Sequence, residues 1–171
     1  MKEYLIHLMK YNQSADRQVI KLLSELSDSD RQSDRKSYYK SLQGLLEHIA
    51  GGALFLQKLI KASCPEVGGL NHKYIDYRLD PGNNTFQDFS EIQAALETLD
   101  SAFVEMVESV TDEDLKKIVL FNLPKIKLEY PLGIFIMQYL NHGTHHRGQI
   151  SQILDEMGID NNFSSIAPQY E

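Results

Sequence analysis

The nine residues from Asn141 to Gln149 carry three of the chain's six histidines, at positions 142, 145 and 146. His142 and His146 stand four residues apart. On an α-helix this spacing brings two side chains to the same face, about one turn apart. Two imidazoles placed in this way can bind one metal ion, as in the helical His-x-x-x-His sequence of zinc enzymes. The spacing therefore predicts part of a metal site, to which another helix must contribute a further ligand.

Each of these histidines also has a plainer interpretation. His142 and His146 lie on an apolar stripe, where a buried imidazole needs a hydrogen-bonding or a metal partner, so the pair is either two core histidines satisfied by backbone or water or part of a metal site. His145 is rotated toward the edge of the stripe. It is an alternative ligand to His146, but a partly exposed helix histidine explains it better. His48 lies on the flank of another apolar stripe, near Gly51-Gly52, and by itself is more often a core histidine. Two glycines inside a helix are unfavourable and indicate a close helix approach or a cavity.

Four segments with helical periodicity must position these side chains: 3–26, 38–62, 86–108 and 131–157. Pro131 suits the beginning of the last helix, and Gly158 suits the left-handed residue after its end. In the first segment the expected apolar stripe consists of Tyr4, Leu8, Tyr11, Ala15, Val19, Leu22 and Leu26.

Two longer connections separate these segments. Residues 65–84 contain prolines and glycines and predict a loop. Lys117–Phe121 and Ile126–Tyr130 flank Asn122–Lys125 and predict a short β-hairpin. The expected fold is therefore a single all-α domain over residues 1–171. It is a four-helix bundle with a long second-to-third helix loop and a short β-hairpin before the last helix.

Composition narrows the class of protein. The chain has 171 residues, a formal net charge of −7 and a single cysteine, Cys64. An acidic chain is a poor partner for nucleic acid, because phosphate contacts need a basic surface. No apolar run approaches the roughly 20 residues that span a bilayer, and the first residues lack the apolar segment of a secretory signal. A lone cysteine excludes an internal disulfide. We expect a cytoplasmic protein that binds neither nucleic acid nor membrane.

His48, together with the string His142-x-x-x-His146-Arg147-Gly148-Gln149, resembles the DinB-like family of metal-binding four-helix proteins. The resemblance covers nearly the whole chain. It implies that His48, His142 and His146 bind a divalent metal ion, zinc or nickel, and that the protein is a homodimer. Related proteins include thiol-cofactor S-transferases and a mycothiol-dependent isomerase. Further matching stretches are Tyr11-Asn12, Tyr38-Tyr39-x-Ser41-Leu42 and Gln152-Ile153-Leu154-x-x-Met157-Gly158.

Three imidazoles would leave a zinc ion one ligand short of tetrahedral, which is typical of catalytic sites. Water at that position acquires a pKa of about 7, and a thiol there is deprotonated. A thiolate attacks an electrophile much faster than a thiol does. We therefore expect a metal-dependent transferase that activates a low-molecular-weight thiol for transfer to an electrophile. The alternatives are a non-catalytic metal-binding stress-response protein, a metal-dependent hydrolase with Glu47 as the nearest acid in sequence, and a metal-free helical interaction domain.

Four further residues are candidates for groups around the ion or its pocket. Arg147 either contacts an anionic cofactor or substrate or, as we prefer, forms a structural salt bridge. Gln149 either hydrogen-bonds a ligand imidazole or packs as a helix amide. Asn141 and Asn12 are weaker candidates for the pocket wall.

Overall fold

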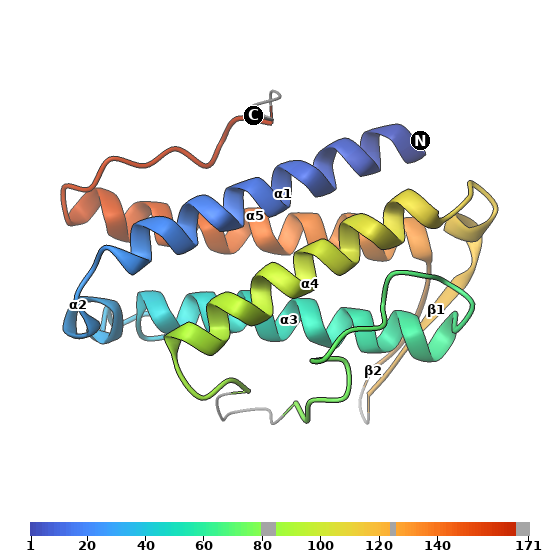
Figure 1. Cartoon of the computed structure of the whole chain (residues 1–171), viewed down its shortest axis with the longest axis horizontal. Helices are drawn as coiled ribbons and strands as arrows, with labels where there is room; N and C mark the ends of the chain where they lie inside the picture. The colour runs from blue at the N-terminus through green and yellow to red at the C-terminus, as the bar shows by residue number, and fades with distance from the viewer. Residues whose placement is uncertain (80–84, 124–125, 167–171) are drawn as a thin grey trace.

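A computed structural model describes residues 1–79, 85–123 and 126–166 of the chain. Four long helices dominate it, which confirms the predicted all-α bundle with a hairpin before the last helix (Figure 1). The short helix α2, which follows the first long helix, was not predicted. In chain order the elements are α1 (Lys2–Ser24), α2 (Asp28–Gln32), α3 (Leu42–Ser63), α4 (Phe89–Ser109), the 3-10 turn η1 (Asp114–Lys116), β1 (Ile118–Leu123), β2 (Ile126–Pro131) and α5 (Leu132–Glu156).

The four long helices do not follow a simple up-and-down order. Both α1 and α3 pack against α4 and α5, so α1 and α3 occupy opposite corners of the bundle. Figure 1 shows α3 and α4 running in the same direction, opposite to α1 and α5. The connection between α3 and α4 must therefore travel back along the bundle, which explains its length. Its described residues 64–79 form neither helix nor strand, as predicted, and residues 80–84 lie outside the described part. The helix predicted from residue 86 begins only at Phe89, because the Asp88 side chain caps it by accepting a hydrogen bond from the Glu91 amide.

Local sequence signals set the helix ends. The helix predicted from residue 38 begins only at Leu42, because the Ser41 side chain accepts a hydrogen bond from the Gly44 amide at 3.0 Å. Lys40, with φ of 64°, has a left-handed backbone that cannot continue a helix. At the other end of the chain, Gly158 takes the predicted left-handed conformation after α5, with φ of 73°.

The buried face of α1 differs from the predicted stripe. Tyr4 is 76% exposed, and Leu8 and Tyr11 are only half-buried. The predicted face is wrong because α1 buries two polar residues, Asn12 and Asp16, that an apolar pattern cannot include. The observed buried set is Leu5, Met9, Asn12, Ala15, Asp16, Val19, Ile20 and Leu23.

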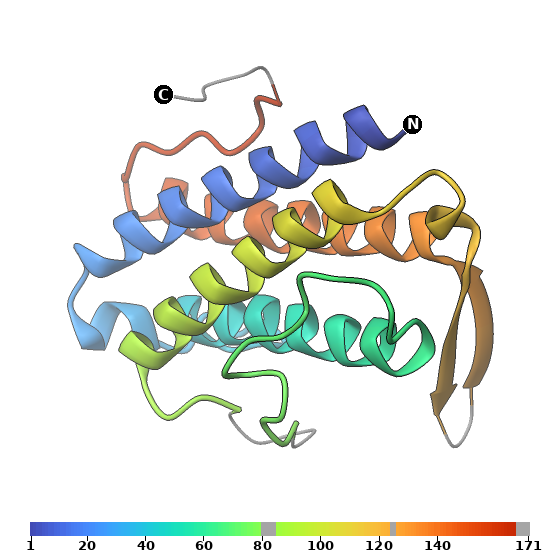
Figure 2. The same ribbon diagram turned by 45° about the vertical axis from the view of Figure 1, so that its right-hand side comes forward.

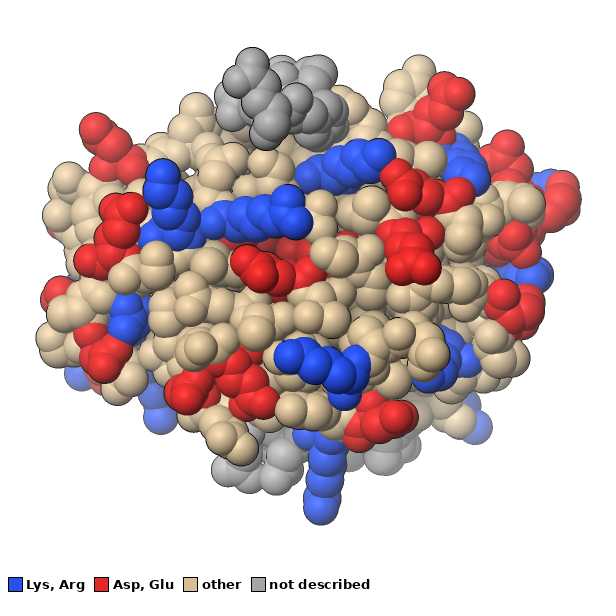
Figure 3. All heavy atoms as spheres, viewed as in Figure 1, with Lys and Arg blue, Asp and Glu red and all other residues tan. Residues whose placement is uncertain are grey.

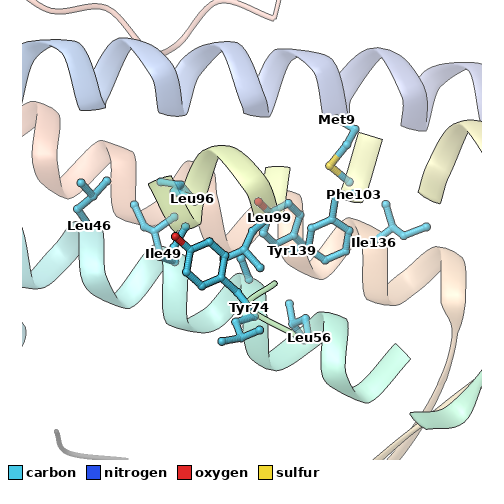
Figure 4. Close-up of a cluster of buried hydrophobic side chains, with 14 of the residues drawn as sticks. Met9, Leu46, Ile49, Leu56, Tyr74, Leu96, Leu99, Phe103, Ile136 and Tyr139 are labelled. Atoms are coloured by element: carbon cyan, nitrogen blue, oxygen red, sulfur yellow. The ribbon is translucent and has the colours of Figure 1, made fainter. Parts of the chain in front are cut away.

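The hydrophobic core lies along the axis of the bundle (Figure 4). Phe103 of α4 stacks on Tyr139 of α5, with ring centroids 4.1 Å apart. The labelled side chains come from all four long helices, and Tyr74 adds the long connection to the same core. This tight packing fixes α3 against α5, the two helices that carry the candidate histidines.

The predicted hairpin is present. Strands β1 and β2 pair antiparallel, with Val119 opposite Tyr130. Pro124 and Lys125, in the predicted connection, lie outside the described residues. The hairpin lies at the end of the bundle where α3 ends and α5 begins (Figure 2). It therefore covers one end of the groove between these two helices.

The surface carries both signs of charge. On the face shown in Figure 3, acidic and basic side chains are interspersed. Among the described residues, no helix is both long and apolar enough to cross a membrane.

Candidate metal centre

The three histidines of the predicted ligand set converge between α3 and α5. One nitrogen from each of His48, His142 and His146 can be chosen so that all three lie within 4.8 Å of one another. The Nε2 atoms of His48 and His142 are 2.9 Å apart. Around one zinc ion with bonds of about 2.05 Å, tetrahedral nitrogens lie about 3.3 Å apart, so a small side-chain movement suffices. His145 is exposed, and the structure does not bring it into this cluster.

The protein keeps these imidazoles uncharged. Burial, followed by the charge of His146, lowers the pKa of His48 to about 4. Burial and the neighbouring histidines lower the pKa of His142 to about 4. Burial also lowers the pKa of His146. A metal ion binds only the unprotonated imidazole, so at neutral pH all three histidines are ready to bind.

A hydrogen bond fixes the orientation of His146. The side-chain oxygen of Gln149 lies 2.7 Å from Nδ1 of this imidazole. Because an amide oxygen only accepts, Nδ1 carries the proton and the lone pair remains on Nε2. Of the two alternatives that the sequence left open for Gln149, this contact is the hydrogen bond to an imidazole. Its role beside a bound ion stays a prediction.

A glycine of α3 makes room for His142. A Cβ atom at Gly52 would lie only 2.7 Å from Cε1 of His142. At Gly51 the nearest atom to a Cβ, in Thr85, is 4.0 Å away. Of the two glycines that the sequence singled out, Gly52 is therefore the one that allows the close approach of α3 and α5.

Tyr39 is a site residue whose role sequence reasoning missed. Its hydroxyl lies 2.9 Å from Nε2 of His48, and the two rings stack with centroids 4.0 Å apart. Gly44 holds this segment close, because a Cβ there would lie 2.1 Å from the Tyr39 carbonyl oxygen. The available signal was Gly44 in the first turn of a helix, a position that otherwise favours residues with higher helix propensity.

The model of one protein family matches nearly the whole chain. The model of the DinB family matches residues 1–163. The chain belongs to the DinB family. No curated protein sequence matches it.

The donor set of this DinB protein fits a divalent ion. Three neutral imidazoles are ligands that zinc and nickel accept. Within the described part of the structure, the buried Nδ1 of His142 has no hydrogen-bond partner. The hydrogen bonds of the cluster therefore leave this nitrogen unpaired, and an ion bound through it would satisfy it.

Arg147 and Asn12 lie elsewhere in this DinB protein. Arg147 is 1% exposed and forms a 2.9 Å salt bridge with Asp16 of α1, which is the alternative that the sequence analysis preferred. Asn12 accepts a hydrogen bond from Arg147 at 2.8 Å. Arg147 points from α5 toward Asn12 and Asp16 of α1, away from His146, since successive residues of a helix differ by about 100° in direction. Arg147, Asn12 and the exposed Asn141 are not among the described residues that line the cavity beside the histidines, so the structure does not bring these three candidates to the pocket wall.

A cavity of about 590 Å³ opens beside the ligand cluster and reaches His48 and His142. Its volume falls within the range of small-molecule sites. The cluster is therefore not sealed inside the bundle.

Proposed function

We propose that this protein is a metal-dependent transferase, in which a divalent ion held by His48, His142 and His146 activates a low-molecular-weight thiol. One observation carries the proposal: three neutral imidazoles converge beside a cavity large enough for a substrate. A purely metal-storing site has no need of such a cavity. The proposed ion is zinc or nickel, which imidazole ligands suit.

A bound divalent ion would supply a Lewis acid that favours the thiolate form of the thiol. In the proposed transfer, the thiol proton leaves to water, the sulfur forms a bond to an electrophilic carbon, and the leaving group departs with its bonding pair. The protein's own residues orient the ligands and hold them neutral. Gln149 sets the tautomer of His146, and the apolar core behind the histidines keeps them uncharged.

The hydrolase alternative lacks its expected acid–base group. The Glu47 carboxylate accepts hydrogen bonds from the backbone amides of Thr85, at 2.6 Å, and Phe86, at 3.3 Å. This carboxylate therefore ties α3 to the segment before α4. Its contacts argue against a role as general base at the ligand cluster.

The test begins with protein purified without an affinity tag and analysed for bound metal. The loaded protein is then assayed with a panel of thiols and electrophiles. We expect about one ion per chain and a thiol-dependent rate above that of metal-free protein. H142A should lose both, whereas H145A, a change at the exposed neighbouring histidine, should keep both. Stoichiometric metal without turnover of any pair would favour the non-catalytic alternative, and absence of bound metal would refute both.

Homodimer formation is a proposal that rests on the family resemblance. Sedimentation equilibrium of the metal-loaded protein checks it, and a mass close to the 19.6 kDa of one chain would refute it.

A further inference from the structure

The walls of the cavity beside the histidines come from three parts of the fold. The imidazoles of His48 and His142 form one part of the wall. The hairpin and the first turns of α5 form another part. Phe55 of α3 and Phe121 of β1 meet edge to face, with ring centroids 5.6 Å apart. The full lining is His48, Gly52, Phe55, Leu56, Phe121, Leu128, Tyr130, Ile134, Phe135, Gln138 and His142.

The described residues that line this cavity are mostly apolar. None of the described residues that line the cavity is an Asp, Glu, Lys or Arg. Apart from the two imidazoles, its polar side chains are Tyr130 and Gln138. A carboxylate or phosphate entering the cavity would lose part of its hydration and meet no lysine or arginine among the described lining residues. An aromatic or branched aliphatic group would instead bury its surface against rings and methyl groups.

From this lining we infer that the electrophile is an uncharged compound with an apolar body, aryl or branched alkyl, which occupies the cavity with its reacting carbon toward His48 and His142. That this compound is an electrophile rests on the proposed function. The inference adds that the compound is uncharged and apolar. A thiol that carries carboxylates would keep its charged part outside this cavity, since no Lys or Arg of the described residues lines it.

The first experiment measures the cavity without any metal, so that its outcome is independent of the proposed transfer. Metal-free protein is titrated with N-phenyl-1-naphthylamine, an uncharged apolar fluorophore, and the dye is then displaced by 4-butylbenzamide or by 4-butylbenzoate. These two competitors have nearly the same shape and differ in charge. We expect the amide to displace the dye at a concentration about tenfold or more below that of the carboxylate, because the charge cannot be solvated in the cavity.

Two substitutions on α5 provide a matched pair. Ile134 and Met137 are both exposed large apolar residues of this helix, at 47% and 52%, so neither change should prevent folding. Only Ile134 lines the cavity. I134E should weaken dye binding by about tenfold, whereas M137E should change it less than about twofold.

The second experiment applies to the metal-loaded protein once it shows transfer activity. Benzyl chloride should then be used with a higher kcat/KM than 4-(chloromethyl)benzoate, and I134E should widen this difference. Equal binding of the amide and the carboxylate, or equal effects of I134E and M137E, would overturn the apolar substrate class. Dye binding with the expected pattern in a protein that has no transfer activity would overturn the proposed function and leave the apolar site standing.

Discussion

Protons and metal ions compete for the same imidazole nitrogens, so the lowered pKa values have a direct consequence for metal binding. The pKa of an exposed histidine is about 6.5, and metal affinity at exposed ligands therefore falls below that pH. His48 and His142 stay unprotonated in the folded protein down to about pH 4. Burial also lowers the pKa of His146, so we expect metal affinity to begin falling at a lower pH than at exposed histidines, and to be lost as the pH is lowered toward 4. Competition titration with a chelator of known pH dependence measures this.

An affinity that already falls steeply between pH 7.5 and 6 would contradict this expectation. The folded state should be verified by circular dichroism at each pH. This control separates protonation of the ligands from unfolding of the chain.

Tyr39 offers a second test at the level of one side chain. The Tyr39 hydroxyl is hydrogen-bonded to Nε2 of His48, and an ion that binds this nitrogen must replace the hydrogen bond. A net hydrogen bond contributes about 0.5–1.5 kcal/mol, so Y39F should tighten metal binding by roughly two- to tenfold. Y38F is the control, because Tyr38 is 89% exposed. Isothermal titration of the three proteins compares them, and weaker binding by Y39F would instead identify the phenol as a ligand of the ion.

Helical spacing predicted His142 and His146 as a pair, and only the family resemblance added His48; the structure brings all three together. Neither argument predicted the role of Tyr39, because that residue reaches His48 from a turn outside any helix. The salt bridge preferred for Arg147 is present, whereas Asn12, a weaker candidate for the pocket wall, contacts Arg147 instead. Apolar periodicity predicts which face of a helix is buried. It does not predict that a charged residue such as Arg147 is buried.

At the level of helices, the approach of α3 to α5 depends on a residue without a side chain. G52A should displace His142, since its Cβ would lie 2.7 Å from Cε1 of that imidazole. We expect a loss of metal affinity of at least about tenfold, together with an overpacking cost of about 1–3 kcal/mol in the free energy of unfolding. Metal titration and urea unfolding measure the two effects.

The neighbouring glycine provides the control for this prediction. G51A has space for its methyl group and should gain up to about 1 kcal/mol in helix propensity without loss of metal affinity. If both variants bound metal as tightly as the original protein, the close approach at Gly52 would have no role in positioning His142.

The helix boundaries show which local rules were sufficient. The end of α5 followed from Gly158, because a left-handed glycine is a strong stop signal. The beginning of α3 did not follow from apolar periodicity, which continues past the Ser41 cap toward residue 38. The buried face of α1 was mispredicted for a related reason. Periodicity counts apolar residues, and this helix buries Asn12 and Asp16.

Across the whole molecule, a buried polar network joins three of the four long helices. Asn12 and Asp16 of α1 meet Arg147 of α5, and Asn12 also donates to Asp100 of α4 at 3.4 Å. Burial and the nearby Asp16 raise the pKa of Asp100 well above its usual value, and burial also raises the pKa of Asp16, an effect that the Arg147 guanidinium opposes. The 2.9 Å ion pair with Arg147 therefore favours Asp16 as the ionised carboxylate of the two. Tyr139 of α5 donates a hydrogen bond to Asp100 and completes the link between α4 and α5.

This network predicts a large stability effect far from the ligand cluster. R147M leaves Asp16 as an uncompensated buried charge, so we expect a loss of about 3–5 kcal/mol in the free energy of unfolding. K10A breaks the exposed pair between Lys10 and Glu108, which also joins two helices, and should cost less than about 1 kcal/mol. Urea unfolding compares the two. The double variant R147M/D16L should recover part of the loss, and equal costs for R147M and K10A would contradict the assignment.

The hairpin that walls the cavity carries none of the three histidines, which all come from α3 and α5. A stretch of chain separate from the histidines thus supplies Phe121, Leu128 and Tyr130 to the cavity wall, while α3 and α5 supply the rest. Under the proposed function, evolution or a protein engineer can change the inner surface of the two-stranded ribbon, and with it the preferred compound, without altering the helices that would hold the ion.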